Sequence, residues 1–173
     1  MIRIKKLFLV VPVLLALLGC GYHLAGTGTS LPTHIKTIGV PIFANSTQGY
    51  QVEQKLTSNV MNILIQRGKY KVVPDSTGVD ALLKGTITSI SLVPITFTSD
   101  GRGKDYNVII TAKVTFTDEI DNKVLYTNPG YVFRGQYQID PTSINYLDRS
   151  GEAIDNIAKD FGESVVSAIL EGF

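Results

Sequence analysis

Cysteine and histidine are scarce in this chain of 173 residues, and their scarcity excludes several kinds of chemistry. Cys20 is the only cysteine, and His23 and His34 are the only histidines. A disulfide within the chain needs two cysteines and a zinc-thiolate site needs several, so both are excluded. The sequence also contains no Ser/His/Asp set and no glycine-rich nucleotide turn. We therefore predict that the protein is not an enzyme and has no metal site.

The chain also has no large excess of basic over acidic residues. The chain has 16 Lys and Arg residues against 15 Asp and Glu residues. Arg3, Lys5 and Lys6 fall in a segment that we expect to be removed, which leaves 13 basic residues and a formal charge of −2. A body with this charge does not coat nucleic acid through bulk electrostatics, so we predict no nucleic-acid partner. Any anion site must be local.

The sequence lacks an apolar run long enough to cross a membrane as a helix. A helical span requires roughly 20 apolar residues. The longest run in this chain, Leu7–Leu18, is shorter. A basic start, a short apolar run and a small residue, Gly19, directly before Cys20 are together typical of a bacterial lipoprotein signal, in which the cysteine thiol carries the diacylglycerol. We therefore predict cleavage after residue 19 and a lipid on Cys20.

The lipid would anchor everything that follows it. Residues 20–34 contain little apolar character and are predicted to form a flexible tether, and residues 35–173 are predicted to form one domain. Gly21, rather than an aspartate, follows Cys20. By resemblance to lipoprotein sorting in Gram-negative bacteria, this favours the outer membrane, with the domain on its periplasmic face. We expect no cofactor apart from the covalent lipid.

Hydrophobic periodicity predicts a mixed α+β domain. Apolar residues recur at helical spacing over about residues 48–67 and 148–170, and Asn45 or Ser46 is expected to cap the first helix. Strands are predicted at 35–43, 70–73, 81–97 and 107–117, followed by strand pieces at 123–127 and 131–139. A bend is expected between Ser91 and Pro94, and a turn at 128–130. The order predicts a two-layer sandwich, a mixed four- to five-stranded sheet with both amphipathic helices on one face and its first two strands parallel.

The strand at 107–117 has the clearest alternation in the sequence. One face should be core, since it carries Val108, Ile110, Ala112, Val114 and Phe116. The other face is a threonine-rich polar wall, with Ile109 as its exception, and carries Asn107, Thr111, Lys113, Thr115 and Thr117.

Several short motifs, in this order and spacing, resemble the LPS-assembly lipoprotein family, LptE. They are Cys20-Gly21-Tyr22-His23-Leu24, Leu31-Pro32, Ile38-Gly39-Val40-Pro41, Phe43-Ala44-Asn45-Ser46-Thr47 and Asp80-Ala81-Leu82-Leu83-Lys84-Gly85-Thr86-Ile87. The resemblance implies two partners, the large outer-membrane β-barrel of the LPS translocon and lipopolysaccharide itself. It implies that the protein plugs this barrel, helps it to assemble and assists insertion of lipopolysaccharide at the cell surface.

A contact with lipopolysaccharide would need cations near the lipid A phosphates. The candidates are Arg102 and Lys104 on a predicted hairpin loop, with Lys113 and Arg134 behind them. For each of them, the sequence alone favours an ordinary surface charge that keeps a loop soluble. Two other functions stay open, a tethered assembly factor or pilotin for another outer-membrane machine and a periplasmic module that binds a small ligand.

The remaining polar residues favour structural roles. His23 and His34 fall at or near the predicted tether. Asp118, Glu119 and Asp121 fall on a predicted hairpin turn, where acidic side chains commonly make local hydrogen bonds, and this favours a turn over a calcium site.

Overall fold

A computed structural model describes residues 31–49, 51–67, 69–97, 99, 101, 103–138 and 146–171. The predicted signal peptide, Cys20 and Arg102 lie outside these residues. Within the described ranges, no helix combines the length and the apolar character needed to cross a membrane.

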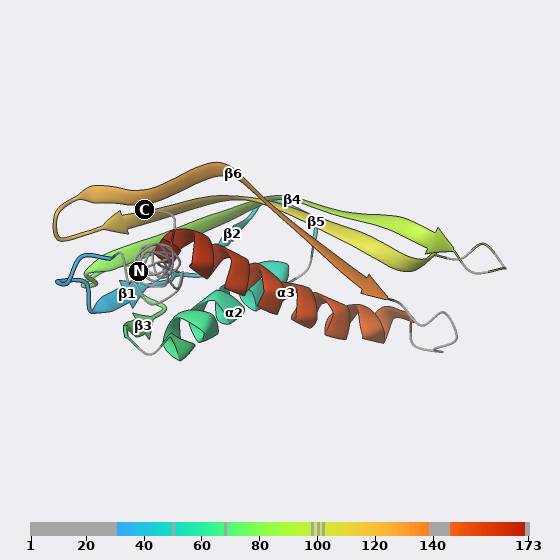
Figure 1. Ribbon diagram of the computed structural model, residues 1–173, viewed down its shortest axis with the longest axis horizontal. Coiled ribbons are helices and arrows are strands. Elements are labelled where there is room, and N and C mark those ends of the chain that lie inside the picture. Colours follow the sequence, from blue (N-terminus) through green and yellow to red (C-terminus); the bar gives the residue numbers. More distant parts are fainter. Residues whose placement is uncertain are drawn as a thin grey trace, which may run out of the picture.

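The structure confirms an α+β fold with two helices on one face of a mixed sheet (Figure 1). The sheet has six strands rather than four or five. They are β1 (Thr37–Gly39), β2 (Ala44–Asn45), β3 (Lys71–Val73), β4 (Ala81–Phe97), β5 (Gly103–Asp118) and β6 (Lys123–Gln138). The helices are α2 (Val52–Gln66) and α3 (Tyr146–Glu171). The extra strand is β2, which was not predicted and lies beyond the strand expected at 35–43. β1 ends before Pro41, which cannot donate to a ladder, and the chain pairs with β4 again at Ala44.

The order of the strands across the sheet is β3-β1-β4-β5-β6, and β2 also pairs with β4. The parallel pairing of β1 with β3 was predicted and is confirmed. β1 and β2 are also parallel to β4, whereas β4, β5 and β6 form a long antiparallel meander. The short strands therefore meet β4 only in its first part, from Ala81 to Ile87.

The core lies between the sheet and the helices. All five residues of the predicted inward face of β5, from Val108 to Phe116, are buried, as is the predicted apolar stripe of α2. α3 contributes Phe161, whose ring meets Tyr131 and Phe133 edge-on at centroid distances of 6.1 and 5.9 Å. Gly162 lets α3 approach α2 closely, because a Cβ at this position would lie 3.1 Å from the backbone of Asn59.

The start of α2 differs from the prediction. It begins at Val52 rather than near Gln48, and Gln51 precedes it in the left-handed region with φ 56° and no side-chain cap. The predicted cap residue Asn45 is used elsewhere. Its Oδ1 accepts hydrogen bonds from the backbone N–H and the hydroxyl of Thr47, and its Nδ2 donates to the backbone oxygen of Gly49. Such an Asx turn competes with helix formation and delays the helix.

The predicted turn at 128–130 is wrong, because β6 is continuous through it. Val114 pairs with Asn128 and Ala112 pairs with Tyr131, so two residues of β6 oppose the single residue Lys113. This is a β-bulge, and the Asn128 side chain stabilises it by accepting the N–H of Gly130 at 3.0 Å. Pro129 is tolerated because β6 is an edge strand among the strands that the structure describes.

The irregularity expected in β4 between Ser91 and Pro94 is displaced to either side. Register shifts fall between Ile87 and Ser89 and again after Pro94. Residues 89–94 are regularly paired with β5. Pro94 therefore lies within the regularly paired part of the strand. The pairing of β4 with β5 is interrupted at Thr88, where the side chains of β4 pass from mostly buried to mostly exposed.

Candidate partner-binding face

Both helices that the structure describes, α2 and α3, lie on the same face of the sheet, and no described helix covers the opposite face (Figure 1). We call this side the open face. Directly opposed residues of neighbouring strands share a face, so the register assigns its members. They are Lys84, Thr86, Ser89, Ser91, Val93, Asn107, Ile109, Thr111, Lys113, Thr115, Thr117, Val124, Thr127, Val132, Arg134 and Gln136, together with the buried Leu82. The threonine-rich wall predicted from the alternation of β5 is therefore the middle of a three-strand surface.

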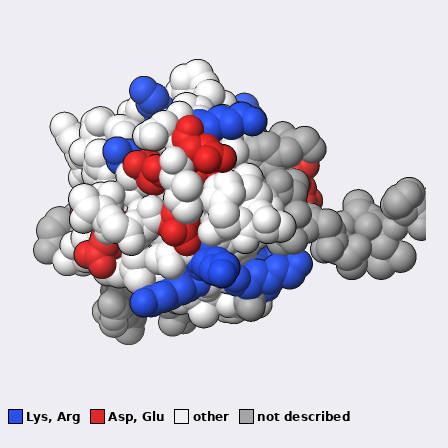
Figure 2. Space-filling view, turned by 90° about the vertical axis from the view of Figure 1, so that its left-hand side faces the viewer, with Lys and Arg blue, Asp and Glu red and all other residues white. Residues whose placement is uncertain are grey.

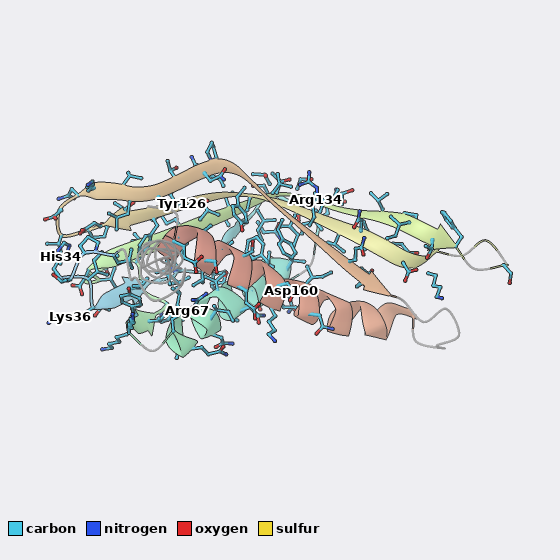
Figure 3. All side chains as sticks on the ribbon, viewed as in Figure 1. His34, Lys36, Arg67, Tyr126, Arg134 and Asp160 are labelled. Carbon is cyan, nitrogen blue, oxygen red and sulfur yellow. The ribbon has the colours of Figure 1, made fainter. Side chains whose placement is uncertain are left out.

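Three cations stand on the open face. Lys113 and Arg134 were predicted as lipopolysaccharide contacts, and the register places both exposed side chains on this side of the sheet. Arg134 is labelled in Figure 3. Lys84 is exposed too and lies diagonally from Lys113, because Thr86 is the direct partner of Lys113. Lys84 was missed by the sequence reasoning. The signal for it was present in the alternation of Leu83, Lys84 and Gly85.

The three predicted cations that the structure describes, Lys104, Lys113 and Arg134, do not form one cluster. Arg134 pairs with Ile109, which precedes Lys113 on β5 by four positions. At the rise of a β-strand, this offset separates the two cations by roughly 13 Å along the sheet. Lys104 is exposed near the beginning of β5, nine positions before Lys113. That offset corresponds to about 30 Å, so Lys104 belongs to the other end of the strand.

The cations of the open face form no ion pair with the side chains that the structure describes. Ion pairs join His34 to Asp118 and Asp121, Arg67 to Glu171, and Lys159 to Glu163. Among the described side chains, none of these pairs involves the three cations of the open face. Lys84 and Lys113 each have a threonine directly opposite, Thr115 and Thr86. The open face can therefore offer both donors to an anion and mixed donors and acceptors to a polar protein surface.

A second polar group lies at the end of the sheet where β5 turns into β6. His34 Nε2 is 2.6 Å from Oδ2 of Asp118, a carboxyl group that is only 1% exposed. Oδ1 of Asp118 accepts the backbone N–H groups of Ile120 and Asp121 at 3.0 and 3.1 Å. Burial raises the pKa of Asp118, but the N–H donors of the turn and the His34 contact outweigh it and hold the pKa below its ordinary value.

Asp80 ties the same end of the molecule together. Its Oδ2 accepts the backbone N–H groups of Lys36 and Thr37 at 2.9 and 2.8 Å. These hydrogen bonds lower the pKa of Asp80, because they stabilise its ionised form. Acidic side chains gather in the middle of this end face, with basic side chains above and below them (Figure 2). The hydrogen bonds attach residues 34–37 to the sheet, so His34 belongs to the folded body, as does the buried Leu31.

His34, Asp118 and Asp121 place three potential metal ligands within 4.8 Å of one another. Both oxygens of Asp118 are already hydrogen-bonded, and Asp121 is largely exposed, with its Oδ2 4.0 Å from His34. The arrangement is that of an anchored hairpin turn. The predicted role of Asp118 in local hydrogen bonds is confirmed.

Comparison with known proteins assigns the family. The family model described as LptE, lipopolysaccharide-assembly, matches residues 35–169. The chain belongs to the LptE family. LptE proteins form a non-enzymatic family of lipopolysaccharide assembly, and no curated protein matches this sequence. The LptE match begins one residue after His34 and contains the whole open face.

Solved structures share the fold of this LptE protein at low sequence identity. An uncharacterised lipoprotein B from Nitrosomonas europaea matches with a TM-score of 0.51 and 12% identity, covering 87% of this chain and 90% of that one. A hypothetical protein from Chlamydia trachomatis matches with a TM-score of 0.55 and 8% identity, covering 80% and 99%. A PelC variant from Paraburkholderia phytofirmans, solved as a dodecamer, matches with a TM-score of 0.50 and 15% identity, covering 83% and 95%.

Proposed function

We propose that this LptE protein is a lipid-anchored subunit of the lipopolysaccharide translocon, held on the periplasmic face of the outer membrane through Cys20. It plugs the translocon β-barrel, helps that barrel to assemble and assists insertion of lipopolysaccharide at the cell surface. Membership of the LptE family supports an assembly role in lipopolysaccharide transport. The observation that carries the finer proposal is the open face, which is polar, threonine-rich and free of helices.

The open face suits the inside of a barrel. The interior of an outer-membrane barrel is polar, so a domain placed in it needs hydrogen-bonding side chains rather than an apolar surface. Thr111, Thr115 and Thr117 provide hydroxyl groups on the central strand of the open face, with further threonines on β4 and β6. A threonine hydroxyl both donates and accepts, so it can pair with either kind of group on a barrel wall.

The cations of the open face are the preferred lipopolysaccharide contacts. Lipid A phosphates are anionic, and the planar guanidinium of an arginine can bind a phosphate through two parallel hydrogen bonds. Arg134 provides such a group, with Lys113 and Lys84 on the same face. Arg102 and Lys104, expected near the β4–β5 turn, form a second and separate candidate contact.

The test combines co-purification with a lipopolysaccharide-binding measurement. We expect the membrane-extracted full chain to co-purify with the translocon barrel and with lipopolysaccharide. The double variant Lys113→Glu/Arg134→Glu should weaken lipopolysaccharide binding at least tenfold, because charge reversal replaces attraction by repulsion at a phosphate. Lys71→Glu is the matched control, since Lys71 is an exposed lysine on β3 and lies outside the open face.

Equal losses in the double variant and in the control would contradict the role of the open face. Co-purification of a different outer-membrane machine would instead support a pilotin. A tightly held small ligand without any barrel would support a periplasmic binding module. The same comparison for Arg102→Glu/Lys104→Glu separates the two candidate contacts.

A further inference from the structure

The end of the molecule where the folded body begins carries four exposed basic side chains, Lys36, Arg67, Lys69 and Lys71. Lys71 donates its backbone N–H to the oxygen of Lys36 at 2.8 Å, so these two lysines lie side by side where β1 and β3 begin. Arg67 follows the last residue of α2 and precedes Lys69 by two positions. Lys36 lies at the same end of the molecule as His34 (Figure 3). We call the four residues the basic strip.

The basic strip concentrates positive charge in a chain whose basic and acidic residues nearly balance. Residues 54–74 include Arg67, Lys69 and Lys71 and contain no acidic residue. Among the ion pairs of the described side chains, Arg67 reaches Glu171 only at 4.0 Å, and none of these pairs includes Lys36 or Lys71. Figure 2 shows basic side chains below the acidic ones on this end face. The positive charge is therefore directed outward from one rim of the end face.

An exposed apolar side chain accompanies the basic strip. Ile65 is 50% exposed in the last turn of α2, two residues before Arg67. Lysine and arginine place their aliphatic stems along apolar surface while the charged group reaches outward. Basic side chains beside an exposed apolar one are typical of a surface that lies on the headgroups of a membrane.

The length of chain between the lipid and the folded body keeps this end near a membrane. Leu31 is buried, and the hydrogen bonds of Asp118 and Asp80 hold residues 34–37 on the end of the sheet. Leu31 follows Cys20 by eleven residues. Even fully extended, a segment of this length spans at most roughly 40 Å. A lipid on Cys20 therefore holds the end with the basic strip within reach of the leaflet that contains the acyl chains.

We propose that the basic strip binds the anionic headgroups of phospholipids in the leaflet that holds the lipid of Cys20. The inference rests on the lipid anchor of the proposed function, but not on the barrel or on lipopolysaccharide. The lipid attaches a single point of the chain, whereas the basic strip fixes how the domain is oriented on the membrane. Each basic residue close to an anionic membrane surface strengthens binding by about fivefold. The basic strip shares no residue with the open face, which stays available to the barrel.

Fluorescence quenching in reconstituted vesicles tests the proposal. Gln66→Cys places a fluorophore on an exposed position next to Arg67, and the unsubstituted full chain provides the labelling background of Cys20. The full lipid-anchored chain is reconstituted in phosphatidylcholine vesicles that contain a nitroxide-headgroup lipid, with or without phosphatidylglycerol. We expect phosphatidylglycerol to increase the quenching by about fivefold or more. High salt should abolish the increase, because it screens the charges.

Retention on neutral vesicles reports the anchor separately. A chain that neutral vesicles do not retain lacks the anchor, which overturns the proposed function together with this inference. A chain that is retained, but whose quenching does not respond to phosphatidylglycerol, overturns the inference alone.

The double variant Lys69→Glu/Lys71→Glu should abolish the increase in quenching. Its matched control is Lys113→Glu/Arg134→Glu, which reverses the same number of charges on the open face and should keep the increase. The two variants should exchange their effects in the lipopolysaccharide-binding measurement. Lys69→Gln/Lys71→Gln removes the charges without reversing them and should reduce the increase by at least about fivefold. Equal quenching in the Lys69/Lys71 variants and in the control would overturn the proposal.

Discussion

Up to Ile87, β4 lies between β5 and the short strands β1 and β2, and its helix-facing side chains are buried. After Thr88 the same strand keeps only β5 as a neighbour among the described strands, and most of its side chains are exposed. A single strand thus belongs to two regions. The first half of the sheet holds the fold together, whereas the second half and the open face leave backbone and side-chain groups available to partners.

Substitution of two phenylalanines, one buried and one exposed, should give the largest difference in stability. Phe161 is fully buried between Tyr131 and Phe133, whereas Phe97 is 61% exposed at the end of β4. We expect Phe161→Ala to lower the free energy of unfolding by about 3–5 kcal/mol, because it removes a large core side chain and leaves a cavity. Phe97→Ala should change it by less than about 0.5 kcal/mol. Urea unfolding measures both, and a similar loss in the two variants would contradict the division of the sheet.

Substitution of two glycines, one in the buried half of β4 and one in the bulge of β6, should give a smaller difference in stability. A Cβ at Gly85, in the buried half of β4, would lie 2.5 Å from the ring of Phe43. A Cβ at Gly130, in the bulge of β6, would meet nothing within 4 Å. We expect Gly85→Ala to destabilise the fold by about 1–3 kcal/mol through overpacking, whereas Gly130→Ala should stay within about 0.5 kcal/mol. Thermal unfolding of the pair measures the difference, and a neutral Gly85→Ala would show that Phe43 can move aside.

The smallest effect concerns the pH dependence of stability. The folded pKa of Asp80 is lowered by the N–H donors of Lys36 and Thr37. Its ionised form therefore stabilises the fold at pH values above the unfolded pKa of about 3.9. This contribution is lost as the pH falls through the folded pKa. We expect Asp80→Asn to lower the unfolding midpoint at about pH 7 and to lower it less at about pH 2.5.

Glu119→Gln is the control for this measurement, because Glu119 is an exposed carboxylate on the neighbouring hairpin. It should leave the midpoint nearly unchanged at both pH values. If Asp80→Asn lowers the unfolding midpoint equally at neutral and acidic pH, then Asp80 stabilises the fold through its packing and not through its charge.

Periodicity was enough to predict the helices and the longer strands but not the two-residue strand β2, because burial on one side of a helix or strand imposes a regular pattern only over several residues. The alternation from Val108 to Phe116 and the stripe of α2 both appear in the core. The bulge at Pro129 and the late start of α2 were not predicted. Each depends on a local competition, in which an asparagine side chain hydrogen-bonds nearby backbone groups and the neighbouring strand decides whether the chain continues.

The residues of the candidate site also divide into those that periodicity predicts and those that only the structure reveals. The polar side of β5 could be recognised from alternation alone, and so could Lys113 as one of its members. The role of His34 could not, since it is 84 residues from Asp118 in the sequence, and a hydrogen bond over that distance leaves no periodic trace. Alternation marks Lys84 as facing away from the core, but only the register of β4 on β5 places it diagonally from Lys113.

By itself, the amino-acid sequence determined the classes of residue that face the core, the order of the helices and the longer strands, the resemblance to the LptE family and the exclusion of a disulfide within the chain. These follow from the composition and from short-range order. Only the tertiary structure decided which strand edges are covered, where β4 passes from core to surface and which distant side chains meet at the β5–β6 turn. The physical reason is that each of these depends on pairing between segments far apart in the chain, and such pairing is selected by the packing of the whole domain.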